Sequence, residues 1–171
     1  LIALQPDHVE LILLHALALS RLHRYQDTLE LVQAIQVMRD WKGLALLKAR
    51  TTLALGAEFL RDGDPDRAYT YLTISRKLRP RHFETNLLYA KVLRAKGYAA
   101  DARRQLERAR RYSNPARAKD RLLIGKEFIA QGYKEEAAKE FVAYLKMVPD
   151  APDRRRLLGL IRKLRGETGE D

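Results

Sequence analysis

Four histidines are the side chains in this sequence with the most obvious capacity for metal or acid–base chemistry. His8, His15 and His23 follow one another at intervals of seven and eight residues, which nearly aligns them on one face of a helix. A zinc site normally needs a closer pair of ligands with a carboxylate on the same face. Because His8 and His23 are expected at helix ends, they are too far apart to converge. We therefore predict packed or solvated histidines and no metal site.

The residue types and spacings that catalysis requires do not occur together. The chain has no cysteine, which removes disulfides, thiol catalysis and Cys-ligated zinc. It has no phosphate-binding Gly-rich loop, nucleophile elbow or zinc-protease motif. Carboxylates such as Glu135 and Glu136 fall at the start of an expected helix, where they favour the helix dipole. No base is paired with a nucleophile, so we predict a binding protein and not an enzyme, with no cofactor and no small-molecule substrate.

Positive charge is the strongest chemical signal. Lys and Arg number 33 against 22 Asp and Glu, a formal net charge of +11. This balance attracts polyanions, anionic membrane surfaces or acidic proteins, and does not choose among them. Residues 103–126 contain nine positive and two negative side chains, so this segment holds +7 of the +11. A solvated helix face usually mixes the two signs. The segment is therefore a candidate binding surface, with Arg-rich genome composition as the alternative explanation.

The elements that must position these charges are predicted to be helices. Hydrophobic residues make up 46% of the chain, enough for a continuous core, and charged residues make up 32%. Leu, Ala, Arg, Lys and Glu predominate, which is a helical composition. Most of the glycines lie between segments with apolar residues at helical spacing. The sequence therefore predicts an all-α protein.

Small residues and prolines recur at a fixed interval. The repeated alanines and glycines lie 34 and 35 residues apart: Ala68, Ala102 and Ala137, and Gly63, Gly97 and Gly132. Each unit also has a small residue in its first helix and a proline that closes its second: Gly56, Ala90 and Gly125, and Pro80, Pro115 and Pro149. The small residues allow two helices to approach closely, the glycines suit a left-handed helix end, and the prolines end helices.

This pattern resembles the tetratricopeptide repeat, whose period is 34 residues. The resemblance covers Ala49 to about Ala151 and implies a right-handed superhelical solenoid of antiparallel helix pairs. The sequence departs from the family pattern at three kinds of position. His23 replaces the Gly that closes a first helix, and Thr28 replaces the Ala at a helix crossing. Thr52, Asn86 and Arg121 stand where the first helix usually has an aromatic residue.

We predict about four repeats plus a C-terminal capping helix. The chain is expected to begin with the end of a preceding repeat at 1–6, a divergent repeat at 7–40 and an extended helix or linker at 41–48 near Trp41. Three regular repeats follow at 49–82, 83–117 and 118–151. A capping helix at 152–165 and a polar tail at 166–171 complete the order. The chain begins at Leu1 without Met, and we expect it to be a fragment of a larger bacterial protein of this family. No apolar run approaches the roughly 18 residues of a membrane span.

The resemblance also places a set of cations. First helices of this family line a concave surface on which ligands commonly lie, and six basic residues map to that surface: Arg50, Arg61, Lys91, Arg94, Lys119 and Lys126. Family members that bind chaperone tails use Lys, Arg and paired Asn for a terminal carboxylate. Here Lys91 and Lys126 occupy two of the Asn positions, so the clamp is incomplete. We predict a broader acidic ligand instead.

Two functions stay open at this point. The resemblance implies a protein–protein interaction scaffold that binds an extended or helical, acidic partner segment. We expect this scaffold to belong to a bacterial envelope, secretion or exopolysaccharide-export assembly. For its location we favour the periplasm or envelope over the cytoplasm. The alternative is polyanion binding to RNA, acidic polysaccharide or an anionic membrane surface. It would use a convex cluster on a second helix: Arg103, Arg104, Arg108 and Arg111.

Overall fold

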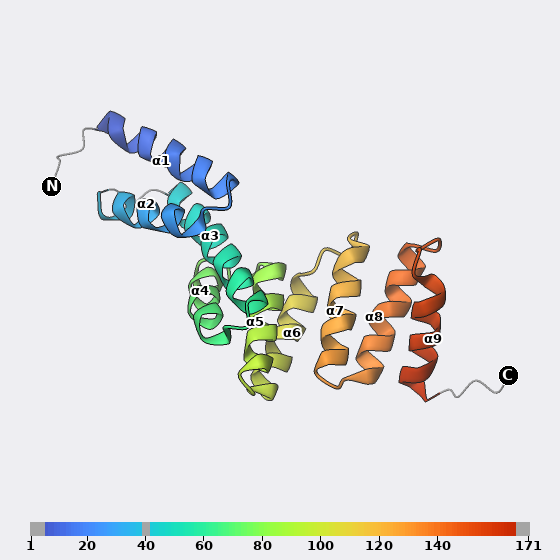
Figure 1. Cartoon of the computed structure of the whole chain (residues 1–171). Helices are drawn as coiled ribbons and strands as arrows, with labels where there is room; N and C mark the ends of the chain where they lie inside the picture. The colour runs from blue at the N-terminus through green and yellow to red at the C-terminus, as the bar shows by residue number, and fades with distance from the viewer. Residues whose placement is uncertain (1–5, 39–41, 167–171) are drawn as a thin grey trace. The chain divides into compact units, whose positions relative to one another are not determined.

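The structure is a computed structural model that describes residues 6–38 and 42–166 (Figure 1). The described residues form nine α-helices joined by turns and contain no strand. The prediction of an all-α protein built from helix pairs is confirmed. Residues 1–5, Trp41 and the tail beyond Gly166 lie outside the described part, so the expectations for them are not addressed.

The chain divides into two compact units, and the first ends at Pro80. Its helices are α1 (Pro6–Arg21), α2 (Tyr25–Met38), α3 (Lys42–Arg61) and α4 (Pro65–Leu78). α1 packs against α2, α2 against α3, and α3 against α4. A core between the first three helices is built from Ala16, Val32, Ile35, Leu44 and Leu47. α3 has 20 residues, and residues 42–48 are part of this helix.

The second unit begins at Arg81 and holds five helices. They are α5 (Phe83–Ala95), α6 (Ala99–Tyr112), α7 (Ala118–Ala130), α8 (Lys134–Met147) and α9 (Arg154–Arg165). α5 pairs with α6 and α7 with α8, and α9 packs on α8 (Figure 1). Phe128, Phe141 and Leu106 are fully buried in its core, which extends to Leu157 and Ile161 of α9.

The helix ends follow the expected chemistry. Gly63, Gly97 and Gly132 have positive φ angles of 80°, 81° and 84°, the left-handed conformation that closes a first helix at no steric cost. His23 occupies the equivalent turn after α1 with a φ of 61°, and its Nδ1 lies 2.6 Å from the Tyr25 hydroxyl. At the start of α4, the Asp64 carboxylate accepts a hydrogen bond from the backbone N–H of Arg67, which lowers the pKa of Asp64.

Close packing at the helix crossings explains the small residues. Ala68, Ala102 and Ala137 have no exposed surface. A Cβ atom added to Gly125 of α7 would lie 2.6 Å from Cε1 of Phe141 on α8, and one on Gly56 would lie closer still to Leu72 of α4. These residues are therefore small because the partner helix occupies the space of a side chain.

Two of the polar residues at the family's usual aromatic position donate a side-chain hydrogen bond to the backbone carbonyl four residues earlier. Thr52 is buried and its hydroxyl donates to the Lys48 carbonyl at 2.8 Å. Asn86 is buried and its Nδ2 donates to the His82 carbonyl at 2.7 Å. A buried polar group costs little when it is bonded in this way, so these departures are compatible with the fold.

We expect Ala102→Arg to lower the free energy of unfolding by more than about 3 kcal/mol, because a long charged side chain cannot enter a filled helix crossing. Ala100→Arg, on an exposed position of the same helix, is the matched control and should change it by less than about 0.5 kcal/mol. Urea unfolding followed by circular dichroism measures both. Equal stability of the two variants would contradict the assigned position of the repeat.

Gly125→Ala and Gly159→Ala should have opposite effects. Both glycines are helical, and alanine is favoured over glycine in a helix by about 1 kcal/mol. A Cβ at Gly159 meets nothing within 4 Å, so this substitution should raise the melting temperature. At Gly125 the clash with Phe141 should outweigh the gain, since overpacking costs roughly 1–3 kcal/mol. Thermal melting that rises for both variants would show that Phe141 can move aside.

Candidate functional site

Four of the six predicted concave cations lie on two first helices of the second unit. Lys91 and Arg94 are three residues apart on α5, and Lys119 and Lys126 are seven apart on α7. Residues at these intervals share one face of a helix. We call Lys91, Arg94, Lys119 and Lys126 the first-helix surface. Arg50 and Arg61 lie on α3 in the first unit, where each is exposed.

An ion pair joins the two helices of the first-helix surface. Nε of Arg94 lies 2.9 Å from Oε1 of Glu127, a carboxylate that is only 3% exposed. Nε2 of Gln131 donates to the same oxygen at 3.2 Å. Because a buried carboxylate needs its partners, Arg94 serves the packing of α5 beside α7. The lysines Lys91, Lys119 and Lys126 make no ion pair within the described ranges, so they supply the available charge.

The convex cluster on α6 is partly neutralised. Arg103 pairs with Glu136 of α8 at 3.3 Å and stacks its guanidinium 4.1 Å from the centre of the Tyr133 ring. Arg104 pairs with Asp101, one turn away on the same helix. Arg108 and Arg111 have no ion pair among the residues that the structure describes. Two of the four arginines in the convex cluster, Arg103 and Arg104, are therefore already paired with acids.

The basic segment 103–126 also supplies two arginines to a buried acid. Glu140 of α8 is 2% exposed, and its two carboxylate oxygens contact different helices. Nε of Arg110 on α6 lies 2.8 Å from Oε1, and Nη1 of Arg121 on α7 lies 3.0 Å from Oε2. The positive run in the sequence is thus balanced by acids from later in the chain, which a count along one segment does not register.

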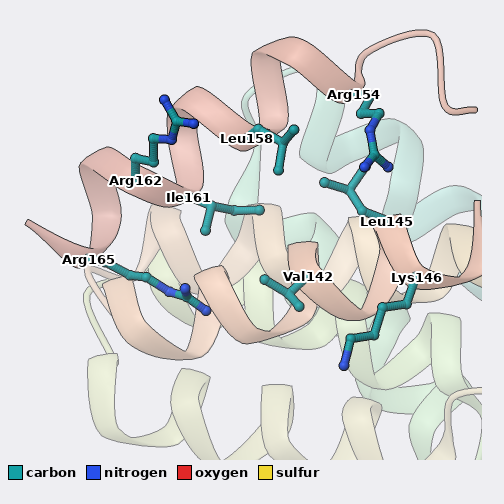
Figure 2. A pocket seen from close by; sticks show the side chains of 8 residues that line it. All are labelled: Val142, Leu145, Lys146, Arg154, Leu158, Ile161, Arg162 and Arg165. Carbon is teal, nitrogen blue, oxygen red and sulfur yellow. The ribbon is translucent and has the colours of Figure 1, made fainter. Parts of the chain in front are cut away.

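A second surface is one that the sequence-based predictions do not include. A cavity of about 320 Å³ lies between α8 and α9 (Figure 2). Its floor is apolar: Val142, Leu145, Leu158 and Ile161. Its rim is basic: Lys146, Arg154, Arg162 and Arg165. We call these eight residues the α8–α9 groove.

The sequence does contain a signal for this groove. The α9 residues that line it follow helical spacing from the first to the last turn: Arg154, Leu158, Ile161, Arg162 and Arg165. The apolar stripe of this helix predicts the covered side of a cap. Leu157 and Ile161 are indeed buried, but Leu158 is 38% exposed. The stripe therefore extends past the surface that α8 covers.

Repeated antiparallel helix pairs with small residues at each crossing define the tetratricopeptide-repeat fold, and the chain has this fold. MamA of Desulfovibrio magneticus RS-1 is similar in structure, with a TM-score of 0.65 and 18% identity over 96% of this chain and 89% of that one. Another MamA crystal structure gives a TM-score of 0.61 and 15% identity over 88% and 84%. TTC0263, a tetratricopeptide-repeat protein of Thermus thermophilus, gives 0.54 and 18% over 85% and 77%.

Sequence comparison adds no relative to these structures. No protein-family model matches the chain, and no curated protein does. The described residues contain no group of three or more His, Asp or Glu that could hold a metal ion. None of the described helices is long and apolar enough to cross a membrane. The arrangement offers basic surfaces on a frame of helix pairs.

Substituting both arginines at Glu140 should cost more than the sum of the single changes. After Arg110→Met or Arg121→Met the carboxylate keeps one partner, whereas the double variant leaves a buried charge unpaired, a loss of about 3–5 kcal/mol. We expect a coupling of at least about 1 kcal/mol in urea unfolding. Arg104→Met, which breaks the exposed pair with Asp101, is the control and should change stability by less than about 1 kcal/mol. If the losses of unfolding free energy in the two single variants simply add up in the double variant, the idea that both arginines support the same buried carboxylate is wrong.

Proposed function

We propose that this chain is a protein–protein interaction scaffold that binds an acidic segment of a partner on the first-helix surface. One observation carries the proposal. Lys91, Lys119 and Lys126 are free of ion pairs within the described part of the chain and lie on two helices that the Arg94–Glu127 pair joins. Their charge is held on a fixed frame, which lowers the entropy cost of binding a carboxylate-rich segment.

The available charge favours this surface over the convex cluster. Three of its four cations have no acidic partner among the described residues, whereas Arg103 and Arg104 of the convex cluster are each paired. Such exposed pairs add little stability, but they reduce the local field that would attract a polyanion. Arg50 and Arg61 of the first unit are exposed and would add to the general attraction for acidic partners. Placement in a bacterial envelope, secretion or exopolysaccharide-export assembly stays an expectation from the family resemblance.

Reversing the charge of the two surfaces separately tests the proposal. One variant carries Lys91→Glu, Lys119→Glu and Lys126→Glu. Arg94 is left intact because its loss would leave the Glu127 carboxylate without its ion pair. The other carries Arg104→Glu, Arg108→Glu and Arg111→Glu, the same change in net charge on α6. Affinity for a fluorescein-labelled peptide of alternating Glu and Ser is measured by anisotropy at about 50 mM salt, with heparin as the competing polyanion.

The first variant should bind the acidic peptide at least tenfold more weakly than the parent, and the α6 variant within about threefold. Circular dichroism must show equal helix content for all three proteins. Polyanion binding would behave differently: heparin affinity would fall steeply between about 50 and 200 mM salt, as counterion release requires. If the α6 variant alone loses binding with such a slope, the polyanion function replaces the one proposed.

A further inference from the structure

The α8–α9 groove is lined by one stripe of residues from each of its two helices. On α8 the lining residues are spaced by three and four positions, at Val142, Leu145 and Lys146. On α9 they extend from Arg154 to Arg165, which is about 16 Å of helix at 1.5 Å per residue. A cavity of about 320 Å³ spread over that length is a shallow channel, not a deep pocket. Figure 2 shows its lining side chains along both helices. The length of the groove matches about three turns of a helix.

The repeat architecture supports the same occupant. In each earlier pair a second helix covers the first: α4 packs on α3, α6 on α5 and α8 on α7. α9 follows α8 as the next first helix would, and it packs on α8. The groove thus corresponds to the side of α9 that a pairing helix would cover. Leu158 is the exposed apolar residue on that side.

Charge sets the chemistry of the occupant. Four cations rim the groove, and no acid lines it. Arg154 donates through Nη1 to the Pro149 carbonyl at 2.9 Å, which fixes it at one end of the groove. Lys146 and Arg162 come from opposite helices and make no ion pair in the described ranges. Both side chains point away from the apolar residues, so their charges lie at the edge of the groove in water (Figure 2).

From these observations we propose that the α8–α9 groove binds an amphipathic acidic helix of a partner protein. Its apolar face would lie on Leu158 and Val142, in the helix-in-groove mode with anchors at i, i+3/i+4 and i+7. Its flanking carboxylates would pair with Lys146 and Arg162. This site is separate from the first-helix surface, and it differs in requiring a helix, because its floor is apolar and its cations lie on both sides.

The probe is a capped 14-residue peptide with Leu at positions 3, 7, 10 and 14 and Glu elsewhere on the flanks, interspersed with Ala. A scrambled peptide of the same composition breaks the apolar stripe. The groove variant carries Lys146→Glu and Arg162→Glu, and the matched control carries Arg155→Glu and Arg156→Glu on exposed α9 positions outside the groove. Leu158→Ser tests the floor without changing charge. Affinity is measured by anisotropy at about 150 mM salt, and melting confirms folding of each variant.

The helical peptide should bind the parent and gain helix content, and the scrambled peptide should bind at least tenfold more weakly. The groove variant and Leu158→Ser should each lose at least fivefold, and the matched control should stay within twofold. Reversal of Lys91, Lys119 and Lys126 should leave this affinity within threefold, which separates a failure here from a failure of the function proposed above.

Three results would overturn the proposal. Equal binding of both peptides would show attraction to general acidity. Groove-dependent binding to vesicles of anionic phospholipid, with no binding of the helical peptide, would assign the surface to a membrane. A mass that doubles with concentration in the parent but not in Leu158→Ser, without peptide binding, would assign it to a second copy of the chain.

Discussion

The distance at which the two helices of each pair cross is the constraint on which the rest of this structure depends. At Gly125 there is no room for one more carbon atom, because Phe141 already occupies that space. Ala68, Ala102 and Ala137 meet the same demand from the second helix. Once this approach is fixed, the large side chains must fill the space between successive pairs, and the basic residues must lie on the outer faces. The surfaces proposed for binding are thus a by-product of how tightly the helices pack.

Buried acids organise the remaining polar contacts of the second unit. Glu127 and Glu140 are almost fully buried, and each is paired with one arginine from the preceding helix pair, Arg94 and Arg110; Glu140 also pairs with Arg121 of its own helix pair. Desolvation of such a carboxylate is costly unless its partners are in place. The same arginines would otherwise count as free positive charge. Part of the charge excess in segment 103–126 therefore serves packing, whereas Lys91, Lys119 and Lys126 make no ion pair within the described ranges.

The sequence is sufficient to predict the helix pairs, because Gly63, Gly97 and Gly132 mark turns whose left-handed backbone only a few residues adopt readily, and the alanines mark crossings. His23 shows the limit of this logic, since it takes the same conformation without being glycine. Ion pairs such as Arg103–Glu136 connect residues 33 positions apart, and no local pattern indicates them. The α8–α9 groove escapes prediction for a related reason: helical spacing identifies an apolar stripe but not how much of that stripe a neighbouring helix covers.

The ion pairs of the two buried carboxylates, Glu127 and Glu140, have a consequence for how the second unit unfolds locally. Glu127 connects α7 to α5, and Glu140 connects α8 to α6, so each carboxylate links one helix pair to the next. In repeat proteins the coupling between neighbours decides whether pairs fray one at a time or open together. Releasing the pair α7 and α8 alone would strand both carboxylates away from Arg94 and Arg110. Their backbone amides should therefore exchange with solvent at rates that match those of α5 and α6, as one cooperative block and not as a graded series from the end of the array.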